Sequence, residues 1–248
     1  MTLSVIIIAK NEAHHLRNCL DSVTWADEII VLDSGSEDHT VAIAREYTPK
    51  VFETDWQGFG VQKQRALAHV TGDWVLNLDA DECVDPELKQ QIISAMNANE
   101  ADAYRIPIQM WFYGKPLRFS SSPQHHIRLF KRAGAKYSED YVHEKIQLPT
   151  TAKIGRIRRS IVHHCLRDMT HAIDKLNLYA TYSAEIRNQN KRRPSLLKTM
   201  GSSAWMFIRC YVLQGGFLDG KPGFVIALYR SHGSWYRGIK QLYRDQPR

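Results

Sequence analysis

Two aspartates one residue apart, Asp79 and Asp81, are the residues whose spacing points most directly to chemistry. They follow the apolar run Trp74–Leu78, and Glu82 comes directly after them. Packing explains such a pair poorly, because unpaired charge is costly beside a core. Carboxylate oxygens are the ligands that Mg²⁺ and Mn²⁺ prefer, and these cations commonly keep substrate phosphates in their coordination shell. The pair therefore predicts a divalent cation that binds a diphosphate, with a surface or helix-capping role as the alternative.

The elements that must position this pair alternate between strands and helices. Apolar runs predict strands at Leu3–Ala9, Glu28–Leu32, Val51–Phe52 and Trp74–Leu78. Helical patterns follow the first three strands, one with Leu16 and Leu20 on one face and two others at Thr40–Tyr47 and Gln62–His69. This alternation predicts a parallel sheet covered by helices on both faces. In such sheets ligands bind beyond the carboxyl ends of the strands, where Asn11, Asp33 and Asp79 fall.

The motifs at these strand ends resemble those of inverting family-2 glycosyltransferases of the GT-A fold. The resemblance is carried by Ile7–Glu12, Val31–Asp38 and Gly72–Glu82. Two later motifs, Arg128–Phe130 and Val142–Glu144, are similar to a subset that includes the lipopolysaccharide core glucosyltransferases of Gram-negative bacteria. The resemblance implies an α/β protein of the GT-A fold, with a mostly parallel nucleotide-binding sheet flanked by helices and a C-terminal helical extension.

The same resemblance implies roles for the residues that match the motifs. Asp81 is expected to bind the metal directly, and Asp79 to contact the ribose or to orient the metal site. Asp33 is expected to contact the nucleotide, usually its uracil. Glu12 is expected near the ribose, while Asn11 either shapes the loop or caps the following helix. The full set expected around the nucleotide sugar is Ala9, Asn11, Glu12, Asp33, Gln64, Arg65, Asp79, Ala80 and Arg128.

The positions of three basic residues in the predicted elements suggest further contacts with the donor. Lys63 and Arg65 lie near the expected crevice, and one of them is predicted to contact the donor while the other lies on a solvated helix face. Arg128 alternates with apolar neighbours in the predicted strand Ile127–Phe130 and can contact the diphosphate or the acceptor. The segment Asp85–Glu87 is predicted to start a helix and is given no catalytic role.

Inversion in one displacement requires a general base that takes the proton of the acceptor hydroxyl. Glu144 is the first candidate and Asp140 the second, and both come after the predicted loop Gly134–Tyr137. His143 is a candidate metal ligand, because GT-A enzymes often use a late histidine, and a hydrogen-bonded structural histidine is the alternative. The adjacent pairs His125–His126 and His163–His164 lack the spacing of a helical zinc site and are given no metal.

Composition limits the organisation and the location of the protein. A chain of 248 residues fits one catalytic domain, expected at 1–165, with a helical C-terminal extension at 166–248. The four cysteines show neither C-x-x-C spacing nor the density of a disulfide scaffold, and the N-terminus does not resemble a signal peptide. These features predict a cytoplasmic protein. The net charge of +7, much of it beyond Lys153, predicts anionic partners.

The C-terminal extension combines apolar and basic residues. Its apolar segment Leu196–Leu213 contains Lys198 and Arg209, so the uncharged stretch is too short for the roughly 20 residues of a spanning helix. Aromatic residues beside cations are typical of helices that lie on anionic membranes. Together with the resemblance to lipopolysaccharide core enzymes, which implies the inner face of the bacterial inner membrane, this pattern predicts a peripheral membrane protein. A helical hairpin packed on the catalytic domain is the alternative.

The predicted activity is transfer of a sugar, with glucose as first choice, from a UDP-sugar to a lipopolysaccharide inner-core acceptor, with heptose as first choice. Another anionic glycolipid or glycan stays open as acceptor. A sugar-phosphate nucleotidyltransferase has a similar sheet, but Ala9–Glu12 lacks the glycine-rich loop of those enzymes. A nucleic-acid-binding module fits the basic C-terminus yet gives no role to the acids Asp33, Asp79, Asp81 and Glu144, so nucleic acid is not an expected partner.

Overall fold

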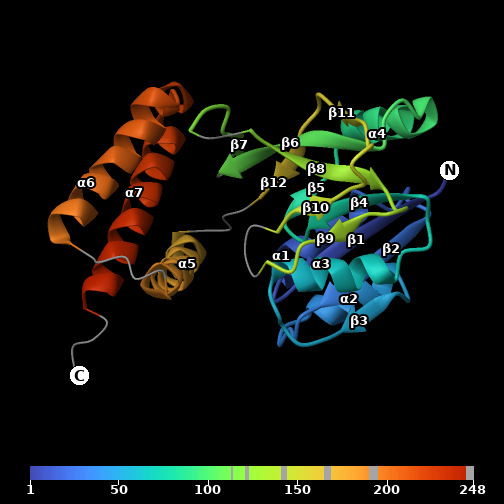
Figure 1. Cartoon of the computed structure of the whole chain (residues 1–248), viewed down its shortest axis with the longest axis horizontal. Coiled ribbons are helices and arrows are strands. Elements are labelled where there is room, and N and C mark those ends of the chain that lie inside the picture. The colour runs from blue at the N-terminus through green and yellow to red at the C-terminus, as the bar shows by residue number, and fades with distance from the viewer. Residues whose placement is uncertain (113, 121–122, 141–143, 165–168, 190–194, 244–248) are drawn as a thin grey trace. The chain divides into compact units, whose positions relative to one another are not determined.

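The computed structural model describes the chain except for residues 113, 121–122, 141–143, 165–168, 190–194 and 244–248. It forms two units, shown by element in Figure 1. The first consists of Met1–Gln109 and Gln124–His164, and the second of Met110–Pro123 and Cys165–Arg248. The segment Met110–Pro123 thus belongs with the C-terminal helices, although it lies in the middle of the sequence.

The first unit is built on a mixed β-sheet with the strand order β3-β2-β1-β4-β8-β6-β12-β5. These strands are β1 (Leu3–Ala9), β2 (Glu28–Asp33), β3 (Val51–Glu53), β4 (Trp74–Asp79), β5 (Glu82–Cys83), β6 (Ala103–Phe112), β8 (Gln124–Lys131) and β12 (Ile161–His163). The four N-terminal strands β1 to β4 run parallel, whereas β8 is antiparallel to both β4 and β6. The parallel half matches the expected nucleotide-binding sheet, and the antiparallel half extends it.

Four shorter strands complete the β-structure. β11 (Ile154–Arg156) pairs in parallel with β6. The strand β12, named above, pairs antiparallel with β5. β9 (Lys136–Tyr137) and β10 (Ile146–Gln147) form a small separate sheet. The predicted loop Gly134–Tyr137 is therefore wrong at its last two residues, because these pair with β10, a strand too short to show in the sequence pattern. In the second unit, β7 (Lys115–Pro116) pairs with the end of β6.

Helices cover both faces of the sheet, as the alternation of elements predicts. They are α1 (Ala13–Asp21), α2 (Thr40–Tyr47), α3 (Phe59–Ala68) and α4 (Pro86–Ala98). Val5 and Ile7 of β1 belong to one apolar cluster with residues of α1, α2 and α4, whereas Ile6 and Ile8 belong to a second cluster with residues of α3. Side chains of a strand alternate between faces, so a sheet buried on both faces needs continuous apolar strands.

Local chemistry fixes where two of these helices begin. The N–H group of Leu88 donates to the Asp85 carboxylate at 2.8 Å, and Pro86 occupies the first helical position, which confirms the predicted start of α4. Helix α3 begins at Phe59, three residues before the predicted start. The preceding Gly58 has φ of 103°, a conformation that favours glycine and lets the chain turn into the helix.

The second unit is helical. It contains α5 (Met169–Gln189), α6 (Leu196–Ile208), the π-helical turn η1 (Arg209–Leu213), the 3₁₀ turn η2 (Gly216–Asp219) and α7 (Lys221–Leu242). Helix α7 packs against both α5 and α6 (Figure 1). Among the residues that the structure describes, none of these helices combines the length and the hydropathy needed to cross a bilayer.

Helix α5 buries mostly small side chains, whereas several of its larger apolar side chains are exposed. Ala172, Leu176, Ala180 and Ala184 are buried, whereas Ile173, Tyr179 and Ile186 are exposed. The buried positions repeat every four residues, which places them on one side of the helix. Ala172 contributes to a cluster with Ile226 of α7, so small side chains there allow close helix packing.

Candidate active site

The candidate site lies at the C-terminal end of β4, in the first unit. Asp79 is the last residue of β4 and lies beside Ile8 of β1, while Asp33 at the end of β2 lies beside Ala9. The parallel register therefore brings the ends of three strands together, as the sequence predicts. The Asp79 side chain is 35% exposed, whereas those of Asp81 and Glu82 are almost covered.

Arg128 lies on β8, which pairs with β4, and its guanidinium binds two of these acids. Its Nη2 atom donates to Asp79 Oδ2 at 2.9 Å and to Glu82 Oε1 at 2.7 Å. Burial lowers the pKa of the guanidinium, but the charges of Asp79 and Glu82 outweigh burial and raise it well above its usual value, so Arg128 stays charged. Its predicted contact with the donor or acceptor stays a prediction, since the buried guanidinium is directed at these two carboxylates.

The two acids bound by Arg128 respond differently to the same cation. Burial raises the pKa of Asp79, but Arg128 and Lys63 together hold it well below its usual range. Burial raises the pKa of Glu82 to about 7, with Arg128 opposing this rise. Glu82 also accepts the N–H of Asp79 at 2.9 Å, so it holds the turn that carries the acid pair. Asp79 is therefore the ionised acid at the strand tip.

Lys63 of α3 joins the predicted base to the strand tip. Its Nζ atom lies 2.6 Å from Glu144 Oε1 and 3.2 Å from Asp79 Oδ1, and its side chain is only 6% exposed. The sequence predicts that one of Lys63 and Arg65 contacts the donor, without deciding which. The structure brings Lys63 to the acids, whereas Arg65 binds Asp55 and Thr54.

Asp81 faces His163, one of the adjacent histidines whose spacing predicts no metal site. His163 Nε2, on β12, lies 3.1 Å from Asp81 Oδ2, and the His164 N–H donates to the Asp81 carbonyl oxygen at 2.9 Å. Burial lowers the pKa of His163, but the Asp81 carboxylate outweighs burial and raises it above its usual value. The expected ligand His143 lies outside the described residues.

The Asp81–His163 pair fits a divalent cation with an incomplete protein shell. Among the residues described, no three His, Cys, Asp or Glu side chains come together as a metal cluster. A carboxylate and an imidazole are suitable ligands for Mn²⁺, and a catalytic cation commonly leaves its other positions to substrate phosphates and water. Among the described residues, the pair supplies two of the ligands that such a cation would need, not the four of a closed structural site.

The loops after β1 and β2 are tied to each other by Asp33 and Asn11. The Asp33 carboxylate accepts the N–H groups of Gly35 and Ser36, at 2.9 Å and 2.8 Å, and is buried. Asn11 Oδ1 accepts the N–H of Glu37, and the Asn11 N–H donates to Ser36 Oγ, both at 2.8 Å. Asn11 has φ of 55°, and it shapes the loop rather than capping α1, whose N-cap is Glu12.

The other predicted residues occupy the same end of the sheet with different contacts. The Glu12 N–H donates to Thr40 Oγ1 at 2.8 Å, and Ala9 and Ala80 are buried in the core. Gln64 Oε1 accepts the N–H of Tyr137 at 2.8 Å, which links α3 to β9. Asp140 is exposed, and its carbonyl oxygen accepts the N–H of Gly60. The roles of these residues toward a donor stay predictions.

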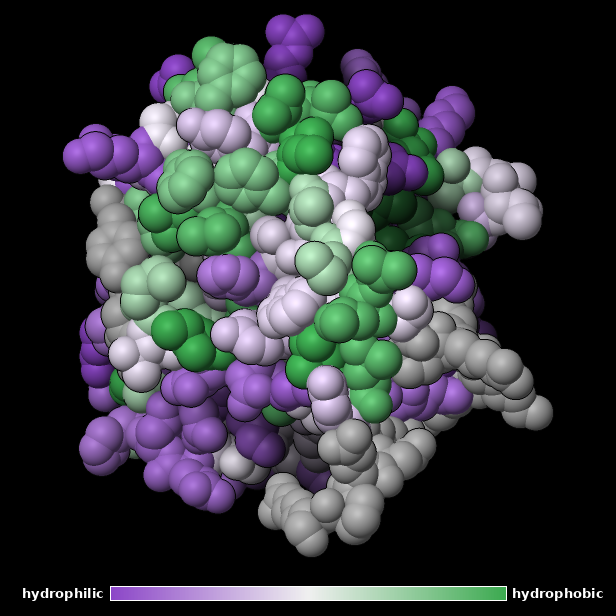
Figure 2. All heavy atoms as spheres, turned by 90° about the vertical axis from the view of Figure 1, so that its left-hand side faces the viewer, coloured by the Kyte–Doolittle hydropathy of each residue, from purple (hydrophilic) through white to green (hydrophobic). Residues whose placement is uncertain are grey.

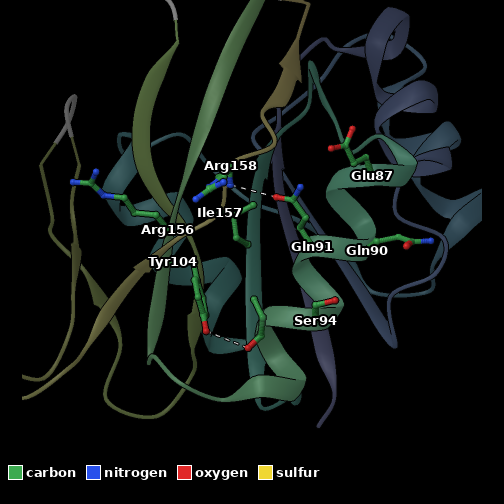
Figure 3. A pocket seen from close by; sticks show the side chains of 9 residues that line it. Glu87, Gln90, Gln91, Ser94, Tyr104, Arg156, Ile157 and Arg158 are labelled. Atoms are coloured by element: carbon green, nitrogen blue, oxygen red, sulfur yellow. Dashed lines mark hydrogen bonds between the residues drawn. The ribbon is translucent and has the colours of Figure 1, made fainter.

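A separate hollow of about 550 Å³ lies over α4 on the first unit. Figure 3 shows Gln91 of α4 pointing toward Arg158 and Ile157, and Tyr104 lying on the same side of α4. Hydrogen bonds between side chains and backbone hold its walls: the Tyr104 hydroxyl donates to the Ala95 carbonyl oxygen at 3.1 Å, and the Arg158 N–H donates to Gln91 Oε1 at 3.3 Å. Its lining residues belong to α4, β6 and the segment 156–158, so it is distinct from the acids at the β4 tip.

A mixed sheet flanked by helices, followed by a C-terminal helical segment, is the architecture of the GT-A fold. The solved structure of S. aureus TarS in complex with UDP-GlcNAc matches with a TM-score of 0.51 at 16% identity, covering 98% of this chain and 92% of that one. At this identity the match shows the fold alone.

Residues 4–166 match the model of glycosyl transferase family 2, and the chain belongs to this family. The lipopolysaccharide core biosynthesis glycosyltransferase LpsC of Rhizobium meliloti is 29% identical over 241 residues, covering 92% of this chain and 87% of LpsC. An uncharacterized glycosyltransferase of Rickettsia bellii is 28% identical over 250 residues, covering 96% of this chain and 85% of that protein. The similarity to both relatives extends well beyond the residues that match the family model.

Proposed function

We propose that this enzyme transfers a hexose from a UDP-sugar to an inner-core lipopolysaccharide acceptor, with inversion and in one displacement. The observation that carries the proposal is the convergence of Asp81–His163 and of Lys63–Glu144 on the end of β4. The similarity to LpsC over most of both chains supports the acceptor class. Glucose and heptose are our first choices, and another anionic glycolipid is the second candidate acceptor. The cytoplasmic face of the inner membrane is the proposed place of the reaction.

Asp81 and His163 are the proposed ligands of a divalent cation, Mg²⁺ or Mn²⁺. When bound, such a cation neutralises charge that develops on the leaving diphosphate. His163 must be neutral to bind a metal, so it has to give up the proton that Asp81 favours. Asp79 stays ionised between Lys63 and Arg128, which suits it to accept a hydrogen bond from a ribose hydroxyl.

Glu144 is the proposed general base. Lys63 holds its carboxylate near the strand end, where the anomeric carbon of a bound donor would be approached from the acceptor side. The side chain is 16% exposed, so an acceptor hydroxyl can reach it while bulk water is largely excluded. In the reaction, Glu144 takes the hydroxyl proton as the acceptor oxygen attacks and the bond to the diphosphate breaks.

The donor is tested by thermal unfolding with UDP-, GDP-, CMP- and dTDP-sugars, each with and without Mn²⁺. A ligand that binds the native state raises the unfolding temperature by mass action. We expect UDP-sugars to raise the unfolding temperature only when Mn²⁺ is present. In Asp81→Asn, UDP-sugars should no longer raise the unfolding temperature even with Mn²⁺. Full activity in EDTA would contradict the metal proposal.

The base is tested by comparing Glu144→Gln with Asp140→Asn. Glutamine keeps the shape of the side chain but cannot take a proton, so turnover should fall about 100-fold or more while UDP-sugar affinity is nearly unchanged. Asp140→Asn is the matched control, because Asp140 was the second candidate. Loss of turnover in Asp140→Asn with normal turnover in Glu144→Gln would reverse the assignment.

A further inference from the structure

In the second unit, helix α6 turns large apolar side chains outward and small or hydroxyl-bearing side chains toward α7, the reverse of a water-soluble hairpin. Figure 2 shows apolar side chains gathered on the face viewed there. Leu197 is 79% exposed, Leu213 63% and Trp205 55%. Other large apolar side chains of the same segment are also exposed, namely Leu196, Met200, Ile208, Val212, Phe217 and Leu218. An apolar surface of this extent is uncommon on a monomeric soluble protein and marks an interaction site.

The seam between α6 and α7 is made of small and hydroxyl-bearing residues. Ser202 Oγ lies 2.8 Å from Ser234 Oγ, and Ser203 Oγ lies 2.9 Å from Ser231 Oγ. A Cβ atom on Gly238 would lie 2.3 Å from Thr199, so a glycine is needed for this close approach. In water the apolar residues of a hairpin turn inward, whereas in lipid small residues and hydroxyl hydrogen bonds hold helices together. The seam therefore favours an apolar solvent on the outer face.

The excess of basic over acidic residues in this part of the chain favours binding to anionic lipid. No Asp or Glu occurs between Glu185 and Asp219, and the exposed residues Lys198 and Arg209 lie within the apolar segment. Residues 166–248 carry 14 Lys and Arg against 5 Asp and Glu. Basic residues beside an apolar face are attracted to anionic lipid headgroups. A positively charged apolar surface is thus complementary to an anionic bilayer surface.

We propose that the outer face of α6 and η1, from Leu197 to Leu213, inserts into the headgroup region of an anionic lipid bilayer. The described helices cannot cross a bilayer, so the hairpin lies in the interface with its serine seam parallel to the surface. Trp205 suits this depth, because an indole combines an apolar ring with a polar N–H group. The proposal stands apart from the sugar-transfer reaction, since binding requires neither donor nor acceptor.

Co-sedimentation of the full chain with vesicles tests this surface. The vesicles contain phosphatidylcholine alone or mixed with phosphatidylglycerol, at low and at high salt. We expect binding to the anionic vesicles, weakened by salt because screening shortens the reach of the charges. Leu197→Ser and Leu213→Ser should each lower partitioning about tenfold. Ile93→Ser, at an exposed position of α4, is the matched apolar control and should bind normally.

Charge reversal tests the lipid preference separately. Lys198→Glu and Arg209→Glu should each lower partitioning onto anionic vesicles about fivefold or more. Arg156→Glu, an exposed position of β11, is the control that changes the net charge equally. Circular dichroism and UDP binding of each variant show that the fold is kept. If UDP fails to bind but vesicle binding behaves as expected, only the transfer proposal fails.

Three results would overturn the membrane proposal. One is equal binding to neutral and anionic vesicles, and another is unchanged binding of the leucine variants. The third is self-association in the absence of lipid that Leu197→Ser and Leu213→Ser abolish, as seen by light scattering. That result would make a second copy of the chain the occupant of the face.

Discussion

At the scale of residues, the candidate site is organised by two buried cations among several acids. Lys63 links Glu144 to Asp79, and Arg128 links Asp79 to Glu82. Buried charges are tolerated when they are paired, and removal of one partner leaves the other uncompensated. The arrangement of the site therefore depends on Lys63 and Arg128 as much as on the acids that lie in the family motifs.

Lys63→Met should lower turnover about 100-fold, because Glu144 then loses the contact that holds it near the reacting atoms. Binding of UDP with Mn²⁺ should change less, since the Asp81–His163 pair is not touched. Steady-state kinetics and calorimetric titration separate the two effects. Arg45→Met, which breaks an exposed ion pair with Glu53, is the control and should keep normal turnover. Equal losses of affinity and turnover in Lys63→Met would assign Lys63 to donor binding instead.

At the scale of elements, Glu28 ties the strands that carry the site. Its carboxylate at the start of β2 accepts hydrogen bonds from Ser4 of β1, from Thr71 before β4 and from Lys50 before β3. Burial raises the pKa of Glu28, but Lys50, Ser4 and Thr71 outweigh burial and lower it to about 2. One carboxylate thus fixes the relative positions of these strands.

This low pKa predicts an acid-dependent stability. A carboxyl with a lowered folded-state pKa contributes stability above its unfolded value near 4.5, and the contribution is lost as the pH falls through the folded value. Glu28→Gln should therefore destabilise the protein by about 1–3 kcal/mol at pH 7, and the difference should shrink between about pH 4.5 and pH 2. Urea unfolding across this range measures it. Glu53→Gln, at an exposed pair, is the control, and a difference that does not depend on pH would contradict the prediction.

The contact between α3 and the segment before Glu144 depends on one glycine. A Cβ atom on Gly60 would lie 2.0 Å from the Ser138 carbonyl oxygen and 2.9 Å from that of Asp140. Gly60→Ala should displace this segment, lower turnover and destabilise the fold by about 1–3 kcal/mol. Gly201→Ala on α6 meets nothing within 4 Å and should be neutral or slightly stabilising, because alanine favours a helix. Thermal unfolding and turnover of both variants decide whether the close approach matters.

At the scale of the whole molecule, the two units differ in chemistry. The acids at the β4 tip and their cations all belong to the first unit, whereas the apolar and basic face belongs to the second. Residues 1–165 carry 19 Lys and Arg against 21 Asp and Glu, so the excess positive charge lies in 166–248. We therefore propose catalysis for the first unit and surface attachment for the second.

Hydrogen exchange followed by mass spectrometry should show this division. UDP with Mn²⁺ should slow exchange in β1, in β4 and around Asp81 and His163, because ligand binding lowers the population of opened states. Anionic vesicles should instead slow exchange in α6 and η1. The matched comparison is UDP without Mn²⁺, which should protect little. Protection of α6 by UDP and Mn²⁺ alone would contradict the assignment of roles to the units.

The sequence alone determined much of the first unit. The strands β1, β2 and β4 and the positions of Asn11, Asp33 and Asp79 at their ends follow from apolar runs that stop at polar loops, because strand burial is a local pattern. The acid pair and the family motifs were also visible.

Only the tertiary structure decided which distant residues meet. His163 lies 82 residues from Asp81, and Glu144 lies 81 residues from Lys63. These contacts depend on β12 pairing beside β5 and on α3 packing near β9, and sheet order is set by the whole chain. The sequence also did not determine which way α6 turns its large apolar side chains. An apolar helix face has the same sequence pattern whether it turns toward a core or away from it, and only the packing partner distinguishes the two.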